Sequence, residues 1–530
     1  LFEYLYQEKV FLNTAFFINI VLSFCGLFVY RVIIKQTFEL YFSEIGSKKL
    51  IRTIIYGTDA NAISVANALK LETPTRFKII GFVDKNNQNA SKRMLDLPIF
   101  VQKKKLPTLM RSVGAVGVII ADRGLSKDEE LIIIEQCLEF NYKVYNLPSI
   151  TDWENQKEIS QKVKTIQIED LLERKPIVLD SKLISKQLKD KTILITGAAG
   201  SIGSEIARQV LKFNPKKIIL LDQAETPLHS LTLETASLNS DTKIVSLVAD
   251  IRNKEAMNRF FKAYTPQVVF HAAAYKHVPL MEDNPSQAIL TNIEGTKNIA
   301  DLSCLYKVKK FVMVSTDKAV NPSNVMGASK RIAEKYVQSL QCKNNKLEDK
   351  SSTKFITTRF GNVLGSNGSV VPLFTKQIAS GGPVTITHPD IIRYFMTIPE
   401  AVSLVLQAGA YAQGGEIFIL DMGEPVKILD LARNMIRLSG YKVDQDIKIE
   451  FTGLRPGEKL YEELLMDEEG MTDTPNKLIH IGHPIDVDEV KLAHALRVLE
   501  SAAQNETDDM RLIVESIVPT YHPKLNKSTQ

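Results

Sequence analysis

The chain has 530 residues, of which 44% are hydrophobic and 24% are charged, and its formal net charge is +5. It is too long for one hydrophobic core, so we expect two or three domains. The net charge is too small in a chain of this size to indicate a nucleic-acid-binding protein. The cysteines form no CxxC pair, which argues against a metal site or a disulfide framework and fits a reducing compartment; they are Cys25, Cys137, Cys304 and Cys342.

Residues 1–48 are predicted to be a membrane-spanning segment with a juxtamembrane linker. The stretch from Ala15 to Ile34 is apolar except for Arg31 near one end, and about 20 such residues suffice to cross a bilayer as a helix. The positive-inside rule then places everything downstream in the cytoplasm, because basic residues follow at Lys35, Lys48, Lys49 and Arg52. No small-residue cleavage site follows, which disfavours a signal peptide. A buried helix of a soluble domain is the alternative.

Residues 49–150 are predicted to form a Rossmann-like domain. Apolar runs at 51–57, 77–84, 115–121 and 142–148 alternate with segments of helical spacing such as 60–71, and this alternation predicts a parallel, doubly wound sheet. After the first strand, Gly57 is followed by Thr-Asp-Ala-Asn-Ala. The second and third glycines of GxGxxG are therefore missing, and dinucleotide binding needs them. A structural or regulatory role is favoured over a bound dinucleotide.

A second α/β domain is predicted over residues 187–515, after a linker at 151–186 and before a C-terminal tail at 516–530. Residues 168–180 of the linker are expected to form an amphipathic helix and then an extended segment that leads into the second domain. A smaller lobe is expected after about Gly381. Six strands are expected in the domain, at 191–197, 216–222, 243–250, 268–274, 310–316 and 354–361.

The first turn of this domain is rich in glycine and runs Thr196-Gly197-Ala-Ala-Gly200-Ser201-Ile202-Gly203. Gly197 permits a tight turn, Gly200 lets the backbone approach a pyrophosphate, and Gly203 allows close helix–strand packing. Asp222 ends the next strand, where a carboxylate hydrogen-bonds a ribose 2′-OH and repels a 2′-phosphate. The pattern predicts NAD rather than NADP; a glycine-rich turn without a ligand is the alternative.

Later strand ends are expected to complete the cofactor site. Asp250 and Ile251 lie where an adenine pocket is expected, and Ala272 and Ala273 have small side chains that leave room for the cofactor. Asn292 is either a helix-start residue or a residue on the cofactor side.

Six motifs occur in a fixed order: TGAAGSIG, HAAAYKHVPLMEDNP (271–285), VSTDKAVNPSNVMGASK (314–330), RFGNVLGSNGSV (359–370), THPDIIRYFMTIPEA (387–401) and GLRPGEKLYEELL (453–465). In these motifs the chain resembles the membrane-anchored UDP-N-acetylglucosamine 4,6-dehydratases of the polysaccharide-biosynthesis branch of the extended short-chain dehydrogenase/reductase superfamily. The resemblance is strong over the second half and includes the arrangement of membrane segment, degenerate Rossmann domain and catalytic domain.

The resemblance implies an α/β fold with a transmembrane helix and two Rossmann-like doubly wound parallel-sheet domains, the second carrying a smaller substrate-binding lobe. It also implies NAD, a UDP-N-acetylhexosamine substrate, a homo-oligomer, and a bacterial inner membrane location with the catalytic domain in the cytoplasm.

The superfamily pairs a tyrosine with a lysine four residues later, so that both face the cofactor from one side of a helix. Lys330 is present here, but Met326 occupies the tyrosine position. A thioether cannot take a proton, so either the domain is inactive or another group has taken over that proton. Some members of the branch that the chain resembles carry methionine here, which favours the second interpretation.

Thr316, Asp317 and Lys318 end a predicted strand, where catalytic groups of doubly wound sheets usually lie. In a 4,6-dehydration, oxidation at C4 makes the C5 proton acidic, a base removes it, and an acid helps the C6 hydroxyl to leave before hydride returns to C6. By resemblance, Lys318 is the C5 base, Asp317 is the acid at O6, and Thr316 hydrogen-bonds the C4 oxygen. We expect nearby positive charge, including that of Lys330, to lower the pKa of Lys318. A turn with a solvated lysine is the alternative.

Six side chains are expected to bind substrate: Lys276, His277, Asn362, Arg393, Arg455 and Glu458. Arg393 and Arg455 are the expected diphosphate clamps, because guanidinium forks match phosphate oxygens. By resemblance, Asn362 meets the diphosphate and Glu458 contacts the uridine ribose. Surface salt bridges and a solvated loop lysine are the alternatives.

Two other functions are considered. A UDP-sugar 4-epimerase needs neither a C5 base nor an O6 acid, so the pair of Asp317 and Lys318 argues against it. A non-catalytic, membrane-tethered NAD or UDP-sugar sensor is supported mainly by Met326.

Overall fold

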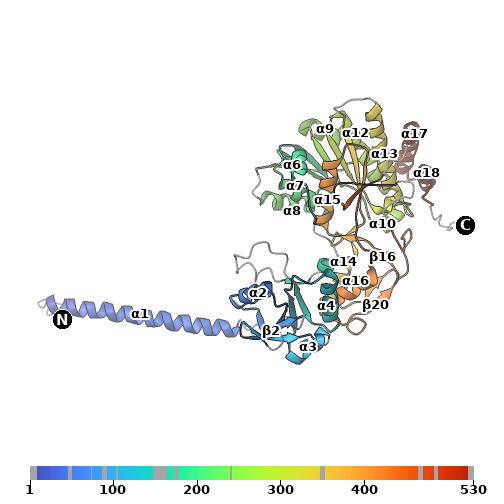
Figure 1. Cartoon of the computed structure of the whole chain (residues 1–530). Coiled ribbons are helices and arrows are strands. Elements are labelled where there is room, and N and C mark those ends of the chain that lie inside the picture. The colour runs from blue at the N-terminus through green and yellow to red at the C-terminus, as the bar shows by residue number, and fades with distance from the viewer. Residues whose placement is uncertain are drawn as a thin grey trace. The chain divides into compact units, whose positions relative to one another are not determined.

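A computed structural model of the chain describes residues 9–45, 50–72, 75–85, 92–102, 105–146, 164–166, 168–171, 177–238, 241–346, 352–463, 470–482 and 487–522. The chain folds as two compact units, Leu1–Ile166 and Gln167–Gln530 (Figure 1). Each unit contains a sheet whose strands are largely parallel, with helices between them. The predicted α/β class with two doubly wound sheets is confirmed.

The N-terminal helix α1 (Lys9–Ile45) contains the predicted membrane span. Ala15–Lys35 forms 21 residues of mean hydropathy 2.1, none of them buried inside the structure (Figure 1). By length and composition this stretch can cross a membrane. Its large apolar side chains are exposed, so it is not a core helix of the part of the chain that the structure describes.

The sheet of the first unit has the strand order β3-β4-β2-β1-β5-β6-β7, with parallel pairing from β4 to β6. Its strands are β1 (Ile51–Tyr56), β2 (Phe77–Asp84), β3 (Arg93–Met94), β4 (Leu97–Val101), β5 (Gly117–Ile120), β6 (Lys143–Asn146) and β7 (Lys164–Thr165), and its helices are α2 (Ala60–Lys70), α3 (Leu106–Val113) and α4 (Lys127–Glu139). All four predicted strands are present; residues 147–148 of the last prediction lie outside the described residues. Gly57 has φ 126°, and an added Cβ would lie 2.9 Å from the amide nitrogen of Asp122. Backbone packing therefore accounts for this glycine.

The sheet of the second unit has the order β10-β9-β8-β11-β12-β13-β18-β22-β21. It is parallel as far as β18, and β22 and β21 pair antiparallel. The strands are β8 (Thr192–Thr196), β9 (Lys217–Asp222), β10 (Lys243–Val248), β11 (Val268–His271), β12 (Lys310–Val314), β13 (Lys354–Arg359), β18 (Ile417–Leu420), β21 (Met471–Asp473) and β22 (Ile479–Gly482). The six predicted strands are confirmed, whereas the last three were not predicted.

Helices cover both faces of this sheet (Figure 1), because alternate residues of each buried strand point to opposite faces. Ile193 packs in the core formed with α6, α7 and α15, whereas its neighbour Leu194 packs with α9, α12 and α13. The helices are α6 (Ser181–Leu188), α7 (Ser201–Leu211), α8 (Glu225–Ala236), α9 (Lys254–Tyr264), α10 (Val278–Asp283), α11 (Pro285–Ala288), α12 (Thr296–Leu305), α13 (Val325–Lys346), α15 (Ile398–Tyr411), α17 (Glu489–Gln504) and α18 (Met510–Ile517), with the π-helix η3 (Ile289–Gly295) and the 3₁₀ turn η4 (Asp317–Ala319).

The predicted smaller lobe is present, but it begins directly after β13 and so before the expected start near Gly381. It contains α14 (Val370–Ala379), α16 (Ile428–Leu438) and three short strand pairs. The pairs are β14 (Asn362–Val363) with β17 (Phe395–Met396), β15 (Val384–Ile386) with β20 (Ile449–Phe451), and β16 (Ile392–Arg393) with β19 (Val426–Lys427). The lobe has its own apolar core, which includes Phe374 and Ile436.

The region predicted as a linker belongs in part to the second unit. Where the helix was predicted, the structure has a 3₁₀ turn, η2 (Ile168–Leu171), and residues 177–180, within the predicted extended segment, have no regular structure; residues 172–176 lie outside the described residues. Ile168 packs in the core of the smaller lobe, and Ile184 and Leu188 of α6 pack in the core of the main sheet. Burial of these apolar side chains begins before the predicted boundary at residue 187. The other predicted domain boundaries remain predictions.

A buried ion cluster centred on Glu334 joins α13 to β13. The Glu334 carboxylate accepts hydrogen bonds from Arg359 at 2.7 and 2.9 Å, from Arg331 at 3.2 Å and from the Ser315 hydroxyl at 2.6 Å. The side chain of Glu334 is fully buried. Burial disfavours its charge, but the guanidinium of Arg359 outweighs this and lowers the pKa of Glu334 to about 2.

We expect Glu334→Gln to destabilise the second unit by roughly 3–5 kcal/mol, because it removes the negative charge beside two buried guanidinium groups. The folded-state pKa is below the ordinary 4.5, so the stabilisation is complete above pH 4.5 and is lost as pH falls towards 2. Chemical denaturation followed by circular dichroism measures both effects. Glu234→Gln is the control, because Glu234 forms an exposed pair with Arg208 and should change stability by at most about 1 kcal/mol. Equal losses in the two variants would contradict the expectation.

Candidate active site

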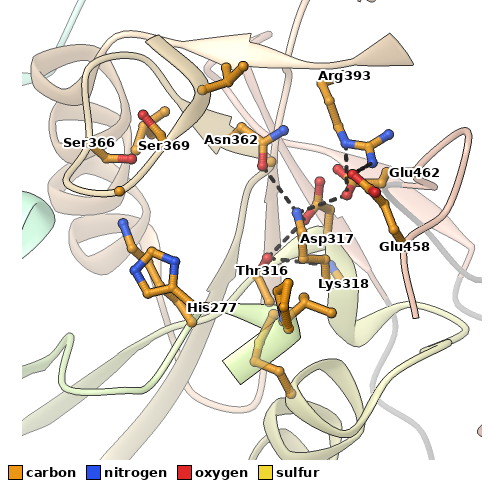
Figure 2. A pocket seen from close by; sticks show the side chains of 18 of the residues that line it. His277, Thr316, Asp317, Lys318, Asn362, Ser366, Ser369, Arg393, Glu458 and Glu462 are labelled. Atoms are coloured by element: carbon orange, nitrogen blue, oxygen red, sulfur yellow. Dashed lines mark hydrogen bonds and ion pairs between the residues drawn. The ribbon is translucent and has the colours of Figure 1, made fainter. Parts of the chain in front are cut away.

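The carboxyl ends of β8, β11 and β12 border a cavity of about 670 Å³, and the carboxyl ends of β9 and β10 border a neighbouring cavity of about 300 Å³. The chain runs through β8, β9 and β10 towards one edge of the sheet and through β11 and β12 towards the other, so the strand order reverses between β8 and β11. Doubly wound sheets bind ligands at such a point. Side chains from the sheet and the smaller lobe meet in the larger cavity (Figure 2). Of the predicted site residues, all within the described part of the chain, Thr196 alone lines neither cavity.

Two glycines of the glycine-rich turn, Gly197 and Gly203, are packed too closely to accept side chains. Gly197 has φ 67°, and an added Cβ would lie 2.6 Å from the backbone of Ala273. An added Cβ on Gly203 would lie 2.1 Å from the carbonyl oxygen of Gly197. Helix α7 begins at Ser201, so its N-terminus, the end that favours an anion, adjoins the larger cavity.

Asp222 lies beside this turn and lines the smaller cavity with Asp250 and Ile251. Its carboxylate accepts the backbone N–H groups of Ala199 and Ala224, each at 2.9 Å. The turn, the helix N-terminus and this carboxylate together fit the diphosphate and adenosine ribose of a dinucleotide.

The structure does not place Thr196 at the cofactor. Its side chain is fully buried, and its hydroxyl hydrogen-bonds His271 at 2.7 Å. The other ring nitrogen of His271 lies 2.9 Å from the hydroxyl of Thr296. Thr196 therefore links the end of β8 to the end of β11, and its side chain does not reach the cavity.

Asn292 has a structural role. It is fully buried, and it accepts the backbone N–H of Tyr275 at 2.8 Å while its amide donates to the Tyr275 carbonyl and the Ser329 hydroxyl. It thereby fixes the loop that carries Lys276 and His277, both of which line the larger cavity.

Asp317 and Lys318 form the centre of the larger cavity. Lys318 Nζ lies 3.0 Å from Asp317 Oδ1 and 3.1 Å from Asn362 Oδ1, and the hydroxyl of Thr316 donates to Asp317 Oδ1 at 2.8 Å (Figure 2). Helix α13 packs so tightly on this turn that an added Cβ on Gly327 would lie 2.1 Å from the Lys318 carbonyl oxygen. The backbone of the pair is therefore held firmly in place.

The pKa of Lys318 differs from the sequence prediction. Burial opposes the charge of both groups, but the Lys318 ammonium and hydrogen bonds from its neighbours hold the pKa of Asp317 below its ordinary 3.8. The carboxylates of Asp317 and Glu462 raise the pKa of Lys318 above its ordinary 10.5 despite the burial. The prediction that positive surroundings lower the pKa of Lys318 is wrong for this structure, because two carboxylates contact the ammonium.

The helix that carries the expected tyrosine position begins beside the same cavity. Met326 is buried and lines the cavity together with Lys330. Lys330 Nζ donates to the carbonyl of Val314 at 2.8 Å, and burial lowers the pKa of Lys330 to about 8 against the opposing charge of Glu334.

The predicted substrate residues all line the larger cavity, but the two arginines differ in their surroundings. Arg393 is buried, donates to the carbonyls of Ile392 and Lys459 at 2.7 and 2.8 Å, and lies 3.5 Å from Glu458. The side chain of Arg455 is 57% exposed and lies 3.3 Å from Glu458, so it is the more accessible of the two to a diphosphate. The roles of these residues in substrate binding remain predictions.

Glu462 was missed in the sequence. Its Oε1 lies 3.0 Å from Lys318 Nζ and 3.3 Å from Arg393 Nε (Figure 2). It stands in the quoted motif RPGEKLYEELL, where Glu463 adjoins it. Both glutamates line the cavity. The acidic residues of the motif were the available signal, but the sequence does not show which of the two contacts Lys318.

Comparison with known proteins identifies the second unit. A family model described as polysaccharide biosynthesis protein matches residues 193–484. The capsular polysaccharide biosynthesis protein CapD of Staphylococcus aureus is 47% identical over 437 residues, which are 82% of this chain and 72% of CapD. A UDP-glucose 4-epimerase of Rickettsia bellii is 37% identical over 284 residues, which are 53% of this chain and 79% of that protein. The X-ray structure of Pen from Bacillus thuringiensis is 38% identical with a TM-score of 0.52, covering 56% of this chain and 89% of Pen. The chain therefore belongs to the polysaccharide biosynthesis protein family.

Proposed function

We propose that this protein is an NAD-dependent UDP-N-acetylglucosamine 4,6-dehydratase that forms UDP-2-acetamido-2,6-dideoxy-hexos-4-ulose. The observation that carries the proposal is the pair of Asp317 and Lys318, 3.0 Å apart in a cavity that the glycine-rich turn also lines. A carboxyl group and an amine in contact supply the acid at O6 and the base at C5 that dehydration requires. The similarity to CapD supports a role in polysaccharide biosynthesis, and the similarity to the UDP-glucose 4-epimerase of Rickettsia bellii supports a nucleotide-sugar substrate.

In this reaction, different residues of the chain carry out the separate proton transfers. The glycine-rich turn and Asp222 would hold NAD, which would supply the hydride acceptor for C4 and the hydride donor for C6. Asp317, ionised at the start, accepts the O4 proton through the hydroxyl of Thr316, with which it already shares a hydrogen bond. The protonated Asp317 then gives this proton to the departing O6. Lys318 takes and returns the C5 proton, and Met326 carries none.

The N-terminal helix supports a membrane tether. We propose that α1 holds the protein at a bacterial inner membrane with the catalytic unit in the cytoplasm, because the basic residues Lys35 and Arg52 follow the apolar span. A homo-oligomeric state remains a prediction.

A UDP-sugar 4-epimerase is the second candidate, favoured by the 37% identity to the Rickettsia protein over about half of the chain. An epimerase uses neither a C5 base nor an O6 acid. The contact between Asp317 and Lys318 inside the cavity therefore favours dehydration.

We expect purified protein to convert UDP-N-acetylglucosamine into a 4-keto-6-deoxy sugar nucleotide, followed by NMR spectroscopy. Oxidation at C4 activates the C5 proton, and elimination turns the C6 hydroxymethyl signal into a methyl signal. A galacto product would select the epimerase. Unchanged sugar, in protein shown to bind NAD, would select the non-catalytic sensor.

We expect the protein to bind NAD at least about tenfold more tightly than NADP, because a like charge placed against a 2′-phosphate costs several kcal/mol. Asp222→Asn should reduce this preference while keeping the shape of the side chain. Calorimetric titration of both dinucleotides measures it. Equal affinities in the wild-type protein would overturn the assignment of Asp222.

We expect Asp317→Asn to lose both hydride transfer and elimination, each by about 10²–10⁴-fold, because one carboxyl group handles the O4 proton and the O6 proton. Single-turnover absorbance of NADH separates the two steps. Accumulation of NADH in Asp317→Asn would show that oxidation at C4 does not need Asp317. Lys318→Ala is the matched comparison: it should still bind NAD but lose exchange of the C5 hydrogen with deuterated solvent.

A further inference from the structure

Glu462 belongs to the catalytic cluster, yet the proposed reaction gives it no task. Its side chain is 6% exposed, and its Oε1 approaches both Lys318 Nζ at 3.0 Å and Arg393 Nε at 3.3 Å. Figure 2 shows its carboxyl group between these two cations. Burial of a carboxyl group beside a reacting lysine is costly unless the charge is used or compensated.

The segment that carries Glu462 is anchored at several points. The carbonyl of Gly457 accepts the Ser323 hydroxyl at 2.9 Å and the Asn324 amide at 3.1 Å. Arg393 donates to the carbonyls of Lys459 at 2.8 Å and Leu460 at 3.2 Å. The contact between Glu462 and Lys318 therefore rests on a fixed backbone, and Arg393 helps to hold Glu462 in position.

The state of Lys318 poses a chemical problem. Its two carboxylate neighbours hold it as an ammonium, whereas a base at C5 must be a free amine. Lys318 therefore has to lose a proton before it can act. Asp317 cannot receive that proton if it has already taken the one from O4. The remaining carboxyl group in contact with Lys318 Nζ, within the described residues, is Glu462.

We infer that Glu462 accepts the proton of Lys318 and so converts Lys318 into the free base for C5. This inference rests on the proposed dehydration and deepens it. Glu462 acts on the substrate only through Lys318, so it is a positioning residue that also stores a proton.

The protons balance over one turnover. The O4 proton moves to Asp317 as hydride leaves C4 for the nicotinamide dinucleotide. The ammonium proton of Lys318 moves to Glu462, and the free amine takes the C5 proton. Asp317 gives its proton to the departing C6 hydroxyl, which leaves as water. After hydride returns to C6, Lys318 protonates C5 and recovers its own proton from Glu462.

Oxidation at C4 prepares this transfer. The carboxylate of Asp317 is the largest source of the negative charge that retains the Lys318 proton. When Asp317 takes the O4 proton, that charge disappears, and Lys318 gives up its proton more readily. The C5 base is thus activated only after C4 has been oxidised, which is when the C5 proton becomes acidic.

The carboxyl groups of Asp317 and Glu462 are both placed to accept or release a proton. Each of the two carboxyl groups shifts the pKa of the other, so Asp317 and Glu462 titrate as a coupled pair. Within the part of the chain that the structure describes, Asp317 Oδ2 and Glu462 Oε2 are both buried without a hydrogen-bond partner. A proton on this pair therefore has a ready acceptor, as in other carboxyl pairs that share one proton.

The titration of Glu462 has identifiable causes. Burial is the largest, and it raises the pKa of Glu462 to about 7 together with the charge of Asp317, against the opposing charges of Lys318 and Arg393. Glu458 meets Glu462 only through Arg393. Glu462 must be ionised to accept a proton, so the rate should rise with pH through about 7.

The experiment compares wild-type protein with Glu462→Gln, Glu462→Asp and the matched control Glu463→Gln. Glutamine still accepts a hydrogen bond from Lys318 but cannot store its proton, whereas Glu463 pairs with Lys459. In deuterated solvent, NMR spectroscopy measures exchange at C5, and single-turnover absorbance measures NADH. We expect Glu462→Gln to slow C5 exchange by about 10²-fold or more, as loss of a proton-transfer group does, and to accumulate NADH.

The pH profile separates this role from a purely structural one. The rise of the wild-type rate through about pH 7 should be absent in Glu462→Gln, retained with a lower plateau in Glu462→Asp, and unchanged in Glu463→Gln. Wild-type C5 exchange with an intact pH rise in Glu462→Gln would overturn the inference. If Glu462→Gln does not fold, an unchanged C5 exchange rate and pH rise in Glu462→Asp would overturn it equally.

A readout without turnover completes the test. Infrared difference spectra of the resting protein should show a carboxyl group titrating near pH 7 that Glu462→Gln removes; the same band in that variant would overturn the inference. Failure of the proposed function can be distinguished from failure of the inference about Glu462. If the proposed function is wrong, wild-type protein forms no 4-keto-6-deoxy product. If wild-type protein forms that product and Glu462→Gln matches it in every measurement, only the role of Glu462 is wrong.

Discussion

The ammonium group of Lys318 is the charge around which the site is built. A largely buried cation requires counter-charges close to it, and the structure supplies Asp317 and Glu462, each 3.0 Å from Nζ. These contacts explain why the lysine is held in its charged form despite burial. They also limit the chemistry, because a lysine held in this way can act as a base only after its proton has somewhere to go. The same carboxyl groups can therefore serve twice. They supply the negative charge that positions Lys318, and they accept the proton that Lys318 must lose before it acts as a base.

The fold brings these groups together from distant parts of the sequence. Asp317 and Lys318 follow β12, where parallel pairing with β13 continues past the strand end through a hydrogen bond from the Asp317 N–H to the Phe360 carbonyl at 3.1 Å. Glu462 arrives from the smaller lobe, whose backbone Arg393 holds from β16. Gly327 packs so close to the Lys318 carbonyl that a side chain at this position would clash with the turn. The sheet therefore positions Asp317 and Lys318, and the smaller lobe positions Glu462.

Features that depend on local patterns could be predicted from the sequence. Buried strands have continuous apolar runs, and the glycine-rich turn has a spacing that reflects backbone contacts, as Gly197 and Gly203 show. The identity of the central pair was also accessible, because Asp317 and Lys318 are adjacent. Features that depend on tertiary contacts could not be predicted. The hydroxyl of Thr196 hydrogen-bonds His271, and of the two adjacent glutamates that line the cavity, Glu462 pairs with Lys318 and Glu463 with Lys459. The pKa of Lys318 is raised rather than lowered because the carboxylates of Asp317 and Glu462 both contact its ammonium group, and these contacts are made by the fold.

Met326 fits this arrangement. A tyrosine in the superfamily's pair moves a proton through a phenol whose ordinary pKa is about 10, so it needs positive neighbours to act near neutral pH. Here the thioether packs in an apolar cluster with Met281 and Val325, and proton transfer falls to carboxyl groups. The environments of Asp317 and Glu462 push their pKa values in opposite directions, which is how pairs of similar groups acquire separate acid and base roles. A carboxyl pair on either side of a lysine can thus replace the phenol and serve the C5 step as well.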